Sequence, residues 1–238
     1  GTDAFKNAFN LVINEASVLS GSKLVDNSRI YHSDANYNLK DMIKFAEVQV
    51  GGSFRQYELN SHGRIYTDAD SPIFYNEYGA YTQITKKLAD ERLKFTGSVR
   101  YDKSKNFDGN YSPRVSFVYS AGANKQHNFR GSFQTGFRNP STQDQYIGFN
   151  VGSAILLGSA PDNLTRYTET LPISATGQTY AGVSANANID GSIAYTNSFT
   201  AVSVATGNPS LFKKTVLNYV KPEEVKAIEL GYRSFFGN

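Results

Sequence analysis

The sequence predicts an all-β protein: an antiparallel, up-and-down sheet that forms part of a transmembrane β-barrel, with long loops and a short N-terminal helix. Three observations predict this fold class. Several segments alternate apolar and polar residues at the period of a strand, long and short links alternate between them, and their polar sides carry arginines.

The stretch FRGSFQTGFRNPS, residues 129–141, shows the strand pattern clearly. Its apolar side holds Phe129, Phe133 and Phe137, and its polar side holds Arg130 and Arg138. Because successive side chains of a strand point to opposite faces, this ribbon has one aromatic face and one polar face. The same alternation predicts strands at residues 45–59, 76–88, 93–102, 114–121, 127–138 and 225–236.

The N-terminal part of the chain lacks this alternation. Apolar residues at helical spacing predict a short helix over residues 3–18 with Asp3 as its cap, and residues 19–42 are expected to be irregular. The chain is thus predicted to be one partial barrel domain, residues 1–238, divided into a loop and helix (1–42), antiparallel strands (43–138), a long extracellular loop (139–222) and a strand (223–238).

Alternation alone does not decide which solvent the apolar face meets, and by itself it favours a soluble sandwich or barrel. The links favour a membrane barrel instead. Residues 60–74, 103–113 and 139–222 are predicted as long links, whereas residues 89–92 and 122–126 are short. Outer-membrane barrels sort their connections in this way, with short periplasmic turns and long outer loops.

The two faces support the same interpretation. The polar face carries five arginines with few acids beside them: Arg100, Arg114, Arg130, Arg138 and Arg233. Aromatic residues lie near strand ends, at Tyr101, Phe137 and Phe236, as expected for girdles at a lipid interface. Phe95, Val99, Phe117 and Phe133 are therefore predicted to face outer-membrane lipid, and Arg100 and Arg130 are predicted to face the lumen.

The composition excludes several other functions. The net charge of +3 and the absence of a basic stripe argue against nucleic acid, and the chain has no Cys. His32, His62 and His127 have no metal-binding spacing, and Asp68 with Asp70 reads as a polar turn rather than a calcium loop. No apolar run is long enough for a transmembrane helix, which needs about 18 residues or more. We predict no catalytic, cofactor-binding or metal-binding residues, and no enzyme.

The long links are the predicted place of ligand recognition. Residues 151–210 carry few charges among many Ser, Thr, Ala, Gly and Asn residues, and residues 139–141 are expected to turn the chain toward a short helix near 142–147. Loops on a rigid scaffold often bind ligands. We predict that a neutral polar ligand such as a glycan or a peptide binds at residues 60–74, 103–113 and 139–222, with Tyr81 and Arg138 as inward candidates.

Several of these segments resemble TonB-dependent outer-membrane receptors of the Bacteroidetes type. The runs that carry the resemblance are VGGSFRQYELNSHGRIYTD (50–68), EYGAYTQITKKLADERLKFTGSVRYD (77–102), SPRVSFVYS (112–120), FRGSFQTGFRNPS (129–141) and EEVKAIELGYRSFF (223–236). The resemblance implies a barrel of about 22 strands filled by a plug, located in the cell outer membrane. It also implies uptake of a glycan, peptide, siderophore or similar ligand, with energy passed from TonB.

The sequence departs from the complete receptor in three respects: it has no TonB box, no plug and too few strands. We therefore expect an internal fragment of the barrel. Contact with TonB is then expected only through parts of the receptor absent here. Two alternatives stay open at this point. One is a small outer-membrane barrel of about eight strands with a structural or adhesion role. The other is a soluble ligand-binding β-domain.

Overall fold

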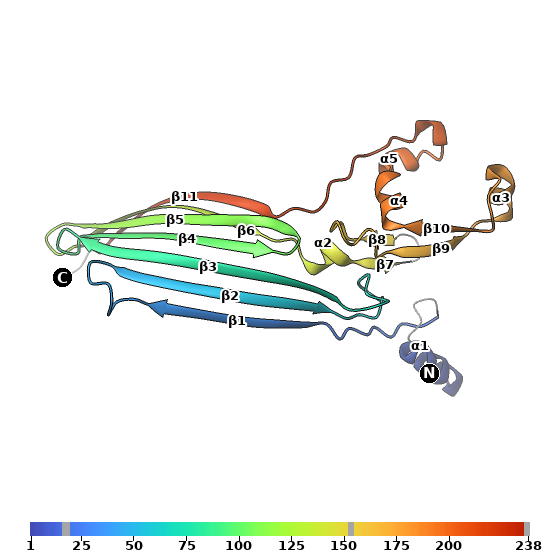
Figure 1. The fold of residues 1–238 in the computed structure, drawn as a ribbon, viewed down its shortest axis with the longest axis horizontal. Coiled ribbons are helices and arrows are strands. Elements are labelled where there is room, and N and C mark those ends of the chain that lie inside the picture. Colours follow the sequence, from blue (N-terminus) through green and yellow to red (C-terminus); the bar gives the residue numbers. More distant parts are fainter. Residues whose placement is uncertain (16–19, 152–154, 236–238) are drawn as a thin grey trace. The chain divides into compact units, whose positions relative to one another are not determined.

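The computed structural model describes residues 1–15, 20–151 and 155–235 (Figure 1). The end of the predicted N-terminal helix and Phe236 therefore lie outside the described residues. The chain divides into two compact units. The loop unit comprises Gly1–Arg29, Glu58–Ile73 and Pro140–Val220, and the sheet unit comprises Ile30–Tyr57, Phe74–Asn139 and Lys221–Asn238.

The sheet unit contains a seven-stranded sheet in the order β1-β2-β3-β4-β5-β6-β11. Figure 1 shows that neighbouring strands run in opposite directions. The strands are β1 (Arg29–Asn38), β2 (Glu47–Leu59), β3 (Ile73–Leu88), β4 (Leu93–Ser104), β5 (Phe107–Ala121), β6 (His127–Arg138) and β11 (Glu223–Ser234). The predicted antiparallel pairing of the four central strands in sequence order is confirmed. The predicted last strand becomes β11, which pairs with β6.

One strand was missed. Residues 29–38 belong to the segment predicted to be irregular, yet they form β1 at the edge of the sheet. Most of its side chains are exposed, including the large apolar ones of Ile30 and Tyr31, which are adjacent and so give no period-two signal. β1 is therefore held by backbone pairing with β2 rather than by burial of one face.

The predicted long link at residues 103–113 is also wrong. β4 continues to Ser104, and β5 begins at Phe107, which leaves only Lys105 and Asn106 between the strands. The run DGNYSP, residues 108–113, contains residue types that are common in turns, but Gly109 lies within β5, where the ring of Tyr101 occupies the space that a Cβ would need. The glycine is thus a packing requirement of the strand pair, and long and short links do not alternate strictly.

The two ends of the sheet still differ. Residues 39–46, 89–92 and 122–126 join strands at one end, which we call the turn end. At the other, the loop end, residues 60–72 and 139–222 leave the sheet beside the tight 105–106 turn.

The loop unit holds short elements. They are α1 (Asp3–Asn14), α2 (Thr142–Tyr146), β7 (Gly148–Asn150), β8 (Ile155–Leu157), β9 (Thr168–Pro172), α3 (Ala175–Ala181), β10 (Asn186–Asp190), α4 (Gly191–Thr196), α5 (Ala201–Val204) and the 3-10 helix η1 (Pro209–Leu211). The predicted helix near residues 142–147 is α2, which Ser141 and Asp144 close with a reciprocal capping box. The cap predicted for α1 is corrected: Thr2, not Asp3, accepts the hydrogen bond from the N–H of Phe5. Within the described ranges, no helix is long and apolar enough to cross a membrane.

Candidate functional site

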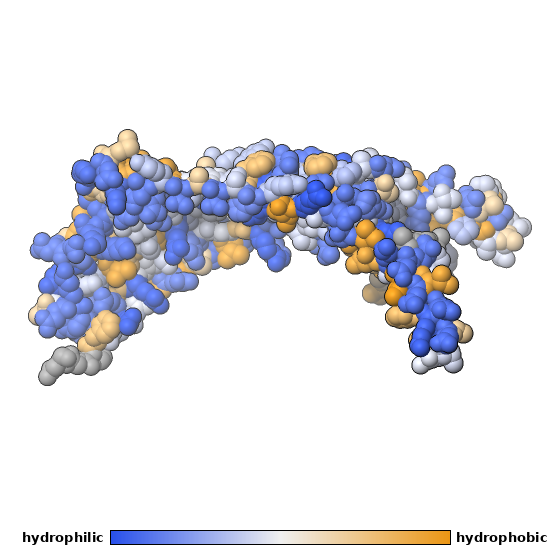
Figure 2. Space-filling model, turned by 90° about the horizontal axis from the view of Figure 1, so that it is seen from below, coloured by the Kyte–Doolittle hydropathy of each residue, from blue (hydrophilic) through white to orange (hydrophobic). Residues whose placement is uncertain are grey.

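The sheet unit has one apolar and one polar face, because residues that pair across antiparallel strands share a face. Phe95 pairs with Phe117, and Phe133 lies opposite Val115 on one side and Ile228 on the other. These apolar side chains are exposed: Phe117 is 44% and Ile228 is 77% accessible. On the side of the molecule seen in Figure 2, hydrophobic residues likewise reach the surface in patches between hydrophilic ones. A sheet of this kind leaves an apolar face without a protein partner in the described chain.

Aromatic rows border this apolar face at both ends. Toward the turn end, Tyr119 pairs with Phe129, which pairs with Tyr232. Toward the loop end, Tyr101 pairs with Tyr111, with ring centroids 4.8 Å apart. Eight residues of β4 separate the two rows, or about 27 Å along the strand. A strand tilt of 35–45° reduces this to about 20 Å, close to the roughly 25 Å apolar band of membrane barrels.

The polar face gathers the predicted arginines. Arg100 pairs with Ser112, Arg114 with Gln134, and Arg233 with Asn128, all on the side opposite the phenylalanines. Arg130 and Arg138 fall on the same side by the same registers. The prediction that one face collects these arginines is therefore confirmed.

Arg100 forms a bidentate pair with a carboxylate and a further hydrogen bond to a serine. Its Nη2 and Nε donate to the Asp102 carboxylate at 2.6 and 2.7 Å, and Nη2 also donates to Ser53 Oγ at 3.0 Å. Ser53 lies on β2, two strands away, so the guanidinium must cross β3. It does so at Gly79, where a Cβ would collide with both Arg100 and Asp102. The glycine thereby lets the guanidinium, which is paired with Asp102 on its own strand, also reach Ser53 and link β4 to β2.

A second polar cluster lies on β2 and β3. Glu77 accepts hydrogen bonds at both carboxylate oxygens: from Arg55 and the Tyr57 hydroxyl on one, and from Asn139 Nδ2 at 2.8 Å on the other. The Tyr57 ring stacks on Tyr75 at 4.4 Å with only 7° between planes. Because Asn139 directly follows β6, this carboxylate fixes the point where the chain leaves the sheet.

The two predicted ligand residues both lie on the polar face but are not brought together. Tyr81 pairs with Arg100 in the middle of the sheet, and its ring covers Gly51. Arg138 is at the loop end of β6, where it forms a 3.1 Å ion pair with Glu223. Three strand spacings separate β3 from β6, or about 14 Å. A ligand that contacted both residues would have to span this distance.

The loop unit is built around the buried polar side chains of Asn163, which the sequence did not single out, and of Asp68, which was predicted to lie in a polar turn. Asn163 is fully buried; its Oδ1 accepts from the Thr67 hydroxyl, and its Nδ2 donates to the carbonyls of Gly158 and Ile147. Asp68 is also buried, and accepts from the hydroxyl of Ser61 and the N–H of Gly63, both at 2.7 Å. These contacts make Asp68 part of a structural turn. The sequence had predicted a polar turn at this position. No spacing signal marks Asn163, because its partner Thr67 is 96 residues away.

Two tyrosines of the long segment 139–222 have raised pKa values. Burial raises the pKa of the Tyr167 phenol, and its hydrogen bond to the Glu169 carboxylate raises the pKa further. Burial also raises the pKa of Tyr195, whose ring stacks on Tyr219 at 5.3 Å. Both shifts favour the neutral phenol and give no sign of a general base.

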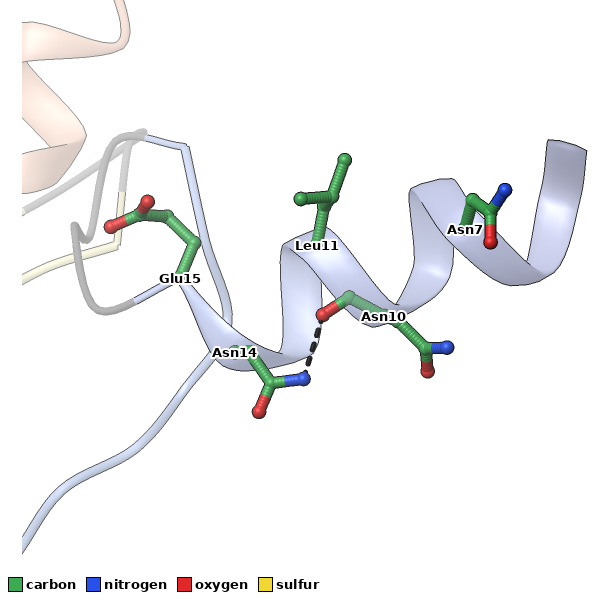
Figure 3. A pocket seen from close by; sticks show the side chains of 5 residues that line it. All are labelled: Asn7, Asn10, Leu11, Asn14 and Glu15. Carbon is green, nitrogen blue, oxygen red and sulfur yellow. Dashed lines mark hydrogen bonds between the residues drawn. The ribbon is translucent and has the colours of Figure 1, made fainter.

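Figure 3 shows a shallow hollow beside α1 whose lining residues all come from that helix and its C-terminal cap. Asn14 Nδ2 donates to the Asn10 carbonyl, a hydrogen bond within the helix. Within the described chain, no group of three or more His, Asp or Glu side chains lies close enough to hold a metal ion.

The arrangement defines a class: a piece of antiparallel sheet with one exposed apolar face bounded by aromatic rows, and one arginine-rich polar face. The chain belongs to the family described as TonB dependent receptor-like, beta-barrel, whose model matches residues 3–238. Proteins of this family are receptors and transporters of the outer membrane.

The comparison with solved structures found the siderophore receptor PirA from Acinetobacter baumannii. The two are 13% identical, the alignment covers 93% of this chain and 27% of that chain, and the TM-score is 0.48. The chain thus spans about a quarter of that receptor. No curated protein sequence matches the chain.

Proposed function

We propose that this chain is a wall segment of an outer-membrane receptor that takes up a nutrient with energy from TonB, and that it is not an enzyme. The observation that carries the proposal is that the phenylalanines and the arginines occupy opposite faces in register across β4, β5, β6 and β11. Charged residues on the apolar side include Lys86 on β3 and Glu224 and Lys226 near the loop end of β11. Family membership supports receptor function over the two alternative classes, a small structural barrel and a soluble β-domain.

In this proposal the apolar face contacts outer-membrane lipid and the polar face lines the lumen. Lipid contact accounts for aromatic and aliphatic side chains that would otherwise be exposed to water, such as Phe117 and Leu230. Backbone groups in the membrane are then satisfied by the strand ladder. TonB would act through parts of the receptor outside this chain.

Recognition is assigned to the segments that leave the loop end, residues 60–74 and 139–222, with Arg138 and Tyr81 on the adjoining wall. Residues 103–113 contribute only their two-residue tip, because the rest is strand. The scarcity of charge in 151–210 and its many hydroxyl and amide groups suit a neutral polar ligand such as a glycan or a peptide.

Two arms of the long segment allow a clean test. Residues 171–187 form an arm closed at its base by the Thr170 and Asn188 pair of β9 and β10. Residues 200–213 form another, closed by the bridge between Phe199 and Lys214. Each arm is replaced in the intact receptor by an Asn-Gly turn, which leaves the buried Asn163 core in place.

We expect removal of at least one arm to abolish ligand binding and uptake while the barrel still assembles. A matched control inserts Asn-Gly into the 122–126 turn, at the opposite end of the sheet, and should leave uptake unchanged. Full uptake after removal of both arms would show that these parts of the long segment only cover the barrel.

A further inference from the structure

A basic hollow lies on the sheet where β5, β6 and β11 approach the turn end. It has a volume of about 530 Å³, within the range of about 300–1,000 Å³ that is usual for small-molecule pockets. Its lining residues are Val118, Asn128, Arg130, Tyr232, Arg233 and Phe235.

The two arginines of the hollow share the polar face of the sheet. Arg130 pairs with Gly231 on β11 and with Val118 on β5, and Arg233 follows Gly231 by two residues on the same face. Arg130 and Arg233 are therefore diagonal neighbours on adjacent strands, about 7–8 Å apart, which long side chains can bridge.

Contacts with a glycine and a ring hold the two side chains at the hollow. Arg130 lies across Gly231, where a Cβ would collide with its Nε, Cγ and Cδ atoms. The guanidinium carbon of Arg233 lies 4.5 Å from the centroid of the Phe235 ring, a cation–π contact. Neither contact uses the N–H donors in the plane of the guanidinium.

The other polar side chains of the hollow already have partners. Asn128 Oδ1 accepts from the Ser120 hydroxyl at 2.7 Å, and its Nδ2 donates to the Lys125 carbonyl. Tyr232 belongs to the apolar face by register, and its hydroxyl is 2.9 Å from His127 Nδ1. The free hydrogen-bonding groups are those of the arginines, which are donors only, so a ligand must supply acceptors.

The positive charge of the hollow is not balanced within the described chain. No acidic residue lines it. Glu229, on the same face of β11, forms no ion pair with Arg130 or Arg233 among the described residues. Lys94 pairs with Val118 on this face and adds a third positive charge two strand spacings from Arg130, or about 10 Å. This surplus favours a ligand with more than one negative charge.

We propose that Arg130 and Arg233 bind a phosphate group. Planar guanidinium groups match phosphate oxygens with two parallel hydrogen bonds each, and a phosphate dianion neutralises both charges. Val118 and Phe235 place apolar surface beside the arginines, which suits the organic part of a phosphate monoester. The proposal rests on the assignment of the polar face to water and is separate from recognition at the loop end, because the hollow lies toward the turn end.

Isothermal titration calorimetry of the intact receptor in detergent, at low ionic strength, tests the site with inorganic phosphate and with phenyl phosphate. We expect saturable binding. Equal affinities identify a site for the free ion, and tighter binding of phenyl phosphate identifies a site for a monoester. Arg130→Gln and Arg233→Gln should each weaken binding about ten- to a hundredfold, since each removes charge-assisted hydrogen bonds. Arg130→Lys keeps the charge without the planar fork and should fall between Arg130→Gln and the wild type.

The matched control is Arg114→Gln, which removes the same charge from the polar face of β5 outside the hollow. It should bind phosphate as the wild type does, and circular dichroism shows that every variant keeps its sheet. Absence of binding of both probes to the wild type would overturn the proposal. So would equal weakening in Arg114→Gln, which would indicate a general charge effect, or binding that survives replacement of both Arg130 and Arg233. The titration needs neither TonB nor the nutrient, so this proposal and the receptor function fail separately.

Discussion

An arginine placed at Phe133 should destabilise the receptor far more than one placed at the next residue, Gln134. The two residues are adjacent on β6 but lie on opposite faces: Phe133 pairs with Val115 on the apolar face, and Gln134 pairs with Arg114 on the polar face. The Val115 row also lies midway between the two aromatic rows of the sheet. Phe133 is therefore expected near the bilayer midplane.

The expected loss of unfolding free energy follows from this position. An arginine at the lipid-facing midplane costs about 2–4 kcal/mol, which lowers the folding equilibrium constant about 30- to 700-fold. An arginine at position 134 stays on the polar side, and surface changes of that kind usually cost within about 0.5 kcal/mol.

Equilibrium unfolding by urea of the intact receptor in lipid vesicles measures both variants. We expect Phe133→Arg to lower the free energy of unfolding by the larger amount and Gln134→Arg to leave it almost unchanged. Equal costs for the two substitutions, or a greater cost at position 134, would refute the assignment of faces.

Three further predictions concern the polar contacts. Asp102→Asn should cost about 1.5–3 kcal/mol in the unfolding assay, because it removes the charge from a half-buried bidentate pair, whereas Glu223→Gln breaks an exposed pair and should cost below about 1 kcal/mol. Asn163→Ala should leave buried groups unsatisfied, cost about 1–3 kcal/mol and speed proteolysis of the loop unit; an unchanged digestion rate would contradict this. The raised pKa of Tyr167 means that the folded state holds its proton longer, so its contribution is complete below about pH 10 and falls as pH rises beyond that. Tyr167→Phe should flatten this part of the stability curve, and an identical decline in both proteins would argue against it.

The central strands could be predicted because the residue pattern that specifies them lies within each strand. In β4 and β6, period-two alternation specifies both the strand and its faces, and β6 occupies the predicted residues 127–138. β1 lacks this signal, since its stability comes from pairing with β2 and not from its own pattern. The error at residues 103–113 also reflects a missing local signal: glycine is common in turns, but the ring that requires Gly109 within the strand belongs to Tyr101 on the neighbouring strand.

The sites were harder to predict, because their partners are distant in sequence. Alternation placed Arg100 on the polar face, but only the sheet brings it to Ser53, 47 residues earlier. Tyr81 and Arg138 were placed on the polar face as predicted, and their role in ligand binding stays a prediction.

The central claim is that the apolar face of the sheet contacts lipid and the polar face lines the lumen. Its most direct test is a cysteine scan of residues 128–137 on β6 in the intact receptor, reconstituted in lipid vesicles. A background without other accessible cysteines is labelled with a water-soluble maleimide and, separately, with a lipid-soluble one. We predict that positions 130, 132 and 134 react with the aqueous reagent and that positions 129, 131 and 133 react only with the lipid-soluble one. Aqueous labelling of position 133 without labelling of position 130 would contradict the account, because it would place the phenylalanines toward water and the arginines toward lipid.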